Sequence, residues 1–72
     1  MSLELLSPIP GKILKILVNI GVKVVEDEEL MKIESMKMEN AIYAPISGTI
    51  KTIHIKENDD VQVDDLLMVI EA

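Results

Sequence analysis

One short run contains the side chains best suited to chemistry, namely Glu34, Ser35, Met36, Lys37, Met38 and Glu39. A lysine that projects from a tight turn is open to an enzyme, and its free amine is a nucleophile that can be acylated. The two methionines beside it offer adaptable apolar surface to a partner or a hydrophobic cofactor. The alternative is a structural role without modification, in which Lys37 is a solvated turn lysine and the neighbouring methionines cap the core. The run therefore makes Lys37 a candidate modification site if it lies at a turn.

The rest of the sequence contains no set of residues that predicts a catalytic centre. There is one histidine, His54, and no cysteine, so no Ser-His-acid or Cys-His arrangement is indicated. We interpret His54 as a strand surface residue. The glycines are isolated and form no phosphate-binding loop. A weak calcium-loop pattern begins at Asp60, but Asp65 occupies the place of its invariant glycine. We expect no catalytic residues and no metal site.

Charge and composition exclude several classes of partner. The formal net charge is −6 and no cluster of lysines occurs, which argues against a nucleic-acid or anionic-membrane surface. No run has the apolar length of a transmembrane helix, and the start lacks the pattern of a signal peptide. We therefore expect protein partners, no direct membrane insertion and a cytoplasmic location.

The elements that must position Lys37 follow from an internal repeat with a constant offset of 37 residues. Among other matches, it pairs Pro8 with Pro45, Gly11 with Gly48, Ile13 with Ile50, Ile16 with Ile53, Leu30 with Leu67 and Ile33 with Ile70. Two repeats are too few for a solenoid. We expect two interlocked halves, related by a pseudo-twofold axis, that bury their apolar faces against each other.

Each half is predicted to consist of strands, because the apolar residues are mostly Ile, Val and Leu. The spacing of three and then two between Ile13, Ile16 and Val18 recurs in the second half and predicts a β-bulge. Ile13 and Ile16 also begin a stripe at helical spacing, but the second repeat has His54 and Glu57 at later positions of that stripe. The strand interpretation is therefore favoured.

The turns and closing strands complete the predicted fold. Pro-x-x-Gly opens each half as a turn in which glycine accepts a conformation that other residues resist. The predicted closing strands are residues 30–34 and 66–71, and a further strand covers 38–44. The fold class is all-β, a flattened antiparallel β sandwich or barrel with a pseudo-twofold internal repeat, a barrel-sandwich hybrid. Lys37 is predicted on the tight turn between the strand ending near Glu34 and the one beginning near Met38.

The chain resembles the biotinyl carrier domains of biotin-dependent carboxylases, decarboxylases and transcarboxylases, within the biotin/lipoyl attachment family. Their signature is Ala-Met-Lys-Met, and the matching residues here are Met36-Lys37-Met38 followed by Ala44-Pro45-x-x-Gly48. The resemblance covers about Ser7 to Ala72. It implies one biotinyl/lipoyl-type carrier domain over residues 1–72, in which residues 1–3 are open to interpretation as a cloning remnant.

The resemblance also implies a function. Lys37 would carry biotin through an amide bond, and recognition by a ligase or partner would involve Glu34, Ser35, Met36, Met38 and Glu39. The chain would be a non-catalytic carrier whose biotin-lysine shuttles a carboxyl group between two sites. The implied partners are a biotin-protein ligase and the biotin carboxylase and carboxyltransferase, or decarboxylase, domains or subunits. The alternatives are a lipoyl carrier and an unmodified adaptor of the same fold. Methionines on both sides of the lysine favour biotin.

Several residues depart from the family pattern. Ser35 replaces the usual alanine, a change from one small residue to another. Asp27, Asn58 and Asp64 stand where the family tends to have glycine, and Asp and Asn are the residues best able to replace glycine at positive φ. We expect left-handed backbone there and intact turns.

Overall fold

The structure, a computed structural model that describes residues 1–72, consists of eight β-strands and no helix. The strands are β1 (Ser2–Leu6), β2 (Gly11–Ile16), β3 (Lys23–Val24), β4 (Glu29–Ser35), β5 (Met38–Tyr43), β6 (Gly48–Ile53), β7 (Asp60–Val61) and β8 (Leu66–Glu71). The helical interpretation of the stripe that begins at Ile13 is wrong, since β2 occupies its first part. There is no helix with the length and hydrophobicity needed to span a membrane.

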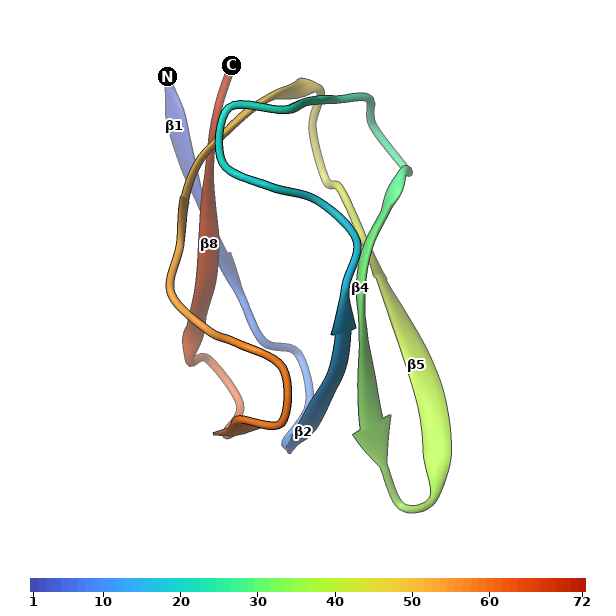
Figure 1. Ribbon diagram of the computed structural model, residues 1–72. Coiled ribbons are helices and arrows are strands. Elements are labelled where there is room, and N and C mark those ends of the chain that lie inside the picture. Colours follow the sequence, from blue (N-terminus) through green and yellow to red (C-terminus); the bar gives the residue numbers. More distant parts are fainter.

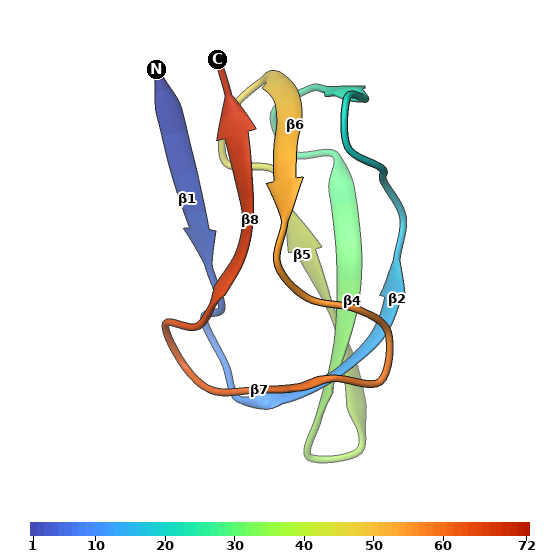
Figure 2. The ribbon, with the colours of Figure 1, turned by 60° about the vertical axis from the view of Figure 1, so that its left-hand side comes forward.

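The strands form two four-stranded antiparallel sheets, in the orders β1-β8-β6-β3 and β5-β4-β2-β7. Figures 1 and 2 show β1 and β8 side by side and β4 and β5 as a long hairpin in the other sheet. The predicted all-β sandwich is confirmed. The repeat accounts for both orders, because the 37-residue offset places β1 on β5, β2 on β6, β3 on β7 and β4 on β8.

Backbone hydrogen bonds between the halves obey the same symmetry. The Ile13 amide donates to the carbonyl of Asp59 at 2.8 Å, and the equivalent Ile50 amide donates to the carbonyl of Val22 at 2.9 Å. Each half thus satisfies backbone groups in a loop of the other. The halves are therefore interlocked, as the repeat predicts.

The bulge expected from the apolar spacing occurs in both halves. The pairing register of β2 with β4 shifts between Ile13 and Lys15, and that of β6 with β8 shifts at the equivalent place, between Ile50 and Thr52. An extra residue in one strand of an antiparallel pair produces such a shift. The bulge lets apolar residues on both sides of it face the core.

A single core fills the space between the sheets. It comprises Ile13, Val18, Val24, Leu30, Met31, Ile33, Ile42, Ala44, Ile50, Val61, Leu67, Met68 and Ile70. Most of these residues form repeat pairs, so the same contacts are built twice. The predicted closing strands are correct in position, with β4 one residue longer at each end and β8 as predicted.

The glycine prediction is partly wrong. Gly11 and Gly48 do not have positive φ; they begin β2 and β6 and lie so close to β4 and β8 that a side chain would not fit. Left-handed backbone occurs instead at Gly21 (φ 90°) and, as expected, at Asp27, Asn58 and Asp64, with φ of 72°, 78° and 71°. Gly21 and Asn58 are repeat equivalents, so asparagine does perform the glycine role.

The sheet edge formed by β1 has a pH-sensitive contact. The Ser2 hydroxyl donates to the carboxylate of Glu71, and this bond is the largest cause that holds the pKa of Glu71 below its ordinary value. Desolvation opposes the effect, and the Lys51 ammonium, 3.8 Å from the carboxylate, supports it. A carboxyl group with a lowered folded-state pKa stabilises the fold above its unfolded-state pKa.

We therefore expect the midpoint of thermal unfolding to fall as the pH drops through the ordinary glutamate range to the lowered pKa of Glu71. In Ser2→Ala this part of the pH dependence should shrink, because the main cause of the shift is removed. NMR titration of the Glu71 carboxyl in both proteins, with thermal unfolding from pH 3 to 7, provides the test. An unchanged pKa in Ser2→Ala would contradict it.

Candidate functional site

The run that contains Lys37 forms the tip of the β4–β5 hairpin. Ser35 and Met38 are the last cross-strand pair, so Met36 and Lys37 alone make the turn. Their φ angles are 53° and 64°. Positive φ at both central residues characterises the type I′ turn, whose twist matches that of a hairpin. The predicted tight turn is confirmed.

This turn is strained by its own sequence. Two-residue turns of this type usually contain Asn-Gly or Asp-Gly, and a left-handed residue with a Cβ atom costs roughly 1–2 kcal/mol. Neither Met36 nor Lys37 belongs to the residue types that adopt this conformation readily. The paired strands on both sides must therefore impose the conformation. Strain that the surrounding structure imposes is typical of functional sites.

The turn side chains lie in solvent. Met36 is 93% exposed, Met38 is 66% exposed, and Lys37 is also exposed. Figures 1 and 2 show the hairpin tip extending beyond the rest of the sandwich, at the end away from both termini. The alternative that these methionines cap the core is wrong, because the core methionines are Met31 and Met68. The amine of Lys37 therefore projects on an accessible tip.

The remaining residues of the run form the base of the tip. Glu34 and Glu39 face each other across the strands and are exposed, whereas Ser35 is partly buried. Like charges in this position repel. The repulsion is offset by Lys12, opposite Glu34 on β2, and by Lys32, whose Nζ is 3.9 Å from Glu39 Oε1. Exposed ion pairs of this kind contribute about 0–1 kcal/mol.

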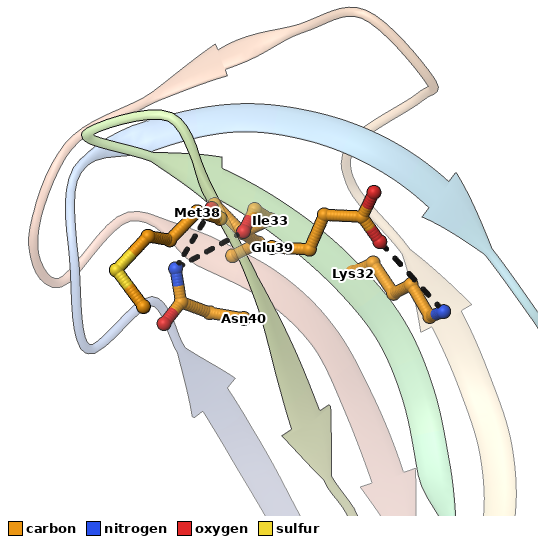
Figure 3. A network of polar contacts seen from close by, with 5 residues as sticks. All are labelled: Lys32, Ile33, Met38, Glu39 and Asn40. Carbon is orange, nitrogen blue, oxygen red and sulfur yellow. Dashed lines mark hydrogen bonds and ion pairs between the residues drawn. The ribbon is translucent and has the colours of Figure 1, made fainter.

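Asn40 supports the tip and was not singled out by sequence reasoning. Its side-chain amide donates to the carbonyl oxygens of Met38, at 3.2 Å, and of Ile33, at 3.4 Å, on the neighbouring strand (Figure 3). It lies on the sheet face that carries buried Ile42. A polar amide on that face of a strand is the signal that could have revealed it, because asparagine is depleted in strands.

Replacing Asn40 by Asp is expected to loosen the hairpin. A carboxylate cannot donate to the two carbonyls and repels both, so we expect a loss of about 1–3 kcal/mol in the free energy of unfolding and faster amide exchange at Lys37. Urea unfolding and hydrogen exchange measure the two effects. Glu39→Gln, at the preceding residue and on the opposite face, is the control and should change stability by less than about 1 kcal/mol, because it removes only an exposed ion pair. Equal effects of the two variants would show that Asn40 has no special role.

The structure has no pocket and no group of three or more His, Cys, Asp or Glu side chains placed to hold a metal ion. His54 is exposed just after β6, and its Nε2 lies 2.9 Å from Thr52 Oγ1. It is thus a surface residue, as expected, although it lies one residue beyond the strand.

The comparisons with known proteins agree with this geometry. The biotin/lipoyl attachment family, described as "Biotin-requiring enzyme", matches residues 3–70. The chain belongs to this family. It is a biotin carrier domain of the kind found in biotin-dependent carboxylases, which confirms the fold and the cofactor class expected from the sequence.

Individual relatives are longer than this carrier domain. The biotin carboxyl carrier protein of Streptococcus mutans is 47% identical over 89% of the chain and 49% of the relative, and pyruvate carboxylase of Bacillus subtilis is 47% identical over 86% of the chain and 5% of the relative. The solved structure of Kluyveromyces lactis urea carboxylase matches with a TM-score of 0.91 and 31% identity, covering 99% of the chain and 6% of that protein. The chain thus spans about half or less of these relatives.

Proposed function

We propose that Lys37 carries the biotin and that the carrier domain shuttles a carboxyl group between the carboxylation and carboxyl-transfer sites of a biotin-dependent enzyme. The observation that carries this proposal is the position of Lys37, on a strained two-residue turn between two exposed methionines at the end of the sandwich. Acylation of the amine by biotin would remove its charge and lengthen the arm.

The rigid sandwich supports this role. The paired strands β4 and β5 pack on the core and fix the base of the hairpin, while the lysine stem and biotin remain free to move. Tethering raises the effective concentration of carboxybiotin at each partner site without releasing it. Contacts with each partner must stay modest, because slow dissociation from one site would delay delivery to the other.

The proposal names the partners by the chemistry that each performs. A biotin-protein ligase attaches the cofactor. It recognises Met36 and Met38 together with the residues at the base of the tip, which are Glu34, Ser35 and Glu39. Biotin carboxylase and carboxyltransferase, or decarboxylase, domains load and unload it. The acceptor is bound by those domains. We place these events in the cytoplasm.

Mass spectrometry of the protein isolated from its native cells tests the proposal. We expect a single biotinyl group, located on Lys37 by peptide mapping. A lipoyl group on Lys37 would show that the domain is a lipoyl carrier. The consistent absence of any adduct would favour an unmodified adaptor. Either result would overturn the proposal.

A further inference from the structure

The methionines of this domain fall into two classes of exposure. Met31 and Met68, which are repeat equivalents, are 0% exposed in the core. Met36 and Met38, which flank Lys37, are 93% and 66% exposed. The only other methionine, Met1, is also exposed, at 81%. The thioethers most open to solvent within the folded hairpin are therefore those next to the lysine.

An exposed thioether reacts with peroxides. A lone pair of Sδ attacks the hydroxyl oxygen of the peroxide, so that an S–O bond forms as the O–O bond breaks. The departing hydroxide or alkoxide then takes the proton of the transferred hydroxyl and leaves as water or an alcohol. The sulfur is oxidised by two electrons to the sulfoxide and the peroxide is reduced. Methionine sulfoxide reductases reverse the change. Thioethers sealed in a close-packed core are shielded from the oxidant.

We propose that Met36 and Met38 are sites of reversible sulfoxidation by peroxides, and that their sulfoxides block acylation of Lys37. The inference rests on the proposed function, which it extends to a redox control of the same tip. It makes loading of the carrier depend on the oxidation state of two side chains that have no part in the core.

The block follows from what an acylating enzyme must cover. To reach the Lys37 amine, such an enzyme has to enclose a two-residue turn, and Met36 and Met38, the residues on either side of Lys37, expose their side chains there. A thioether enters an apolar contact at little cost, whereas a sulfoxide oxygen must give up hydrogen bonds with water. The fold is unaffected, because both side chains project into solvent.

The first measurement is independent of any ligase. Folded domain is treated with hydrogen peroxide, and peptide mass mapping follows each methionine over time. We expect sulfoxide at Met36 and Met38 well before Met31 and Met68, with unchanged thermal unfolding. Oxidation of Met31 or Met68 as fast as that of Met36 would overturn the inference.

The second measurement compares biotinylation rates before and after peroxide, using a biotin-protein ligase, biotin and ATP. We expect the rate to fall at least about tenfold and to recover after treatment with methionine sulfoxide reductases. In the double variant Met36→Leu/Met38→Leu, whatever its own rate, peroxide should leave that rate unchanged although Met1 still oxidises. In the matched control Met68→Leu, peroxide should lower the biotinylation rate as much as in the wild type.

The outcomes separate the two proposals. If untreated domain is never biotinylated at Lys37, the proposed function fails and this inference fails with it. If untreated domain is biotinylated and the fully sulfoxidised domain reacts at the same rate, the inference alone is wrong. A fall in rate that persists in the double variant would assign the effect to another residue and would also overturn it.

Discussion

Replacing Lys37 by Arg is expected to give a folded domain that a biotin-protein ligase does not biotinylate at all. An ammonium group can lose its proton and attack an activated biotin ester, whereas a guanidinium stays protonated and has no free amine lone pair. The fold should persist, because both residues present a Cβ atom to the left-handed turn and the exposed tip buries little.

The other lysines should not replace Lys37. They lie on strands β2, β3, β4 and β6 or, for Lys56, in the loop after β6, and none occupies a two-residue turn. Lys32 and Lys51 are further occupied by ion pairs with Glu39 and Glu71. A ligase that must enclose a protruding tip cannot enclose a lysine in the middle of a strand.

The experiment incubates wild type, Lys37→Arg and the control Lys51→Arg with ligase, biotin and ATP, followed by intact mass and peptide mapping. Wild type and Lys51→Arg should each gain one biotinyl group, on Lys37. Stoichiometric labelling of Lys37→Arg at any other lysine would show that the site assignment is wrong. Circular dichroism of all three proteins checks that they are folded.

Much of the fold could be predicted from the repeat, because a constant offset relates most of the apolar strand residues of one half to those of the other. The bulge is an example, since the broken alternation after Ile13 recurs after Ile50 and requires the same extra residue in both strands. The left-handed residues at Asp27 and Asp64 follow likewise from their position in turns. These features depend on local sequence, and the second copy serves as a check.

Other features depend on contacts distant in sequence. Ser2–Leu6 was not predicted as a strand, because its pairing with β8 joins opposite ends of the chain and its repeat equivalent, Glu39–Tyr43, shares none of its residues. The left-handed turn at Met36 and Lys37 goes against the preference of both residues. It follows only from the register of the two strands that enclose it.

The sequence predicted that Gly48 is needed for its backbone freedom in a turn, whereas the structure shows that it is needed for space between strands. Its replacement leads to the largest expected change in stability. Gly48 lies on β6 between β8 and β3. A Cβ atom there would lie 2.5 Å from the carbonyl oxygen of Glu71 and 2.9 Å from Cγ2 of Ile70. Gly11, its repeat equivalent, would meet the corresponding atoms of Glu34 and Ile33. Both glycines therefore permit two strands to approach closely.

Gly48→Ala is expected to cost about 3 kcal/mol or more, the upper end for overpacking, because the atom that must move belongs to a paired backbone and not to a flexible side chain. A domain of this size has a free energy of unfolding of roughly 4–11 kcal/mol in total, so much of its stability would be lost.

Gly21→Asn is the matched control. Gly21 has φ of 90° and open space around it, and Asn58 occupies the equivalent position at φ of 78°. Gly21→Asn should therefore change stability by less than about 1 kcal/mol. Urea unfolding of both variants decides whether close approach or backbone freedom is the reason for glycine at position 48, since near-wild-type stability of Gly48→Ala would exclude the steric cause.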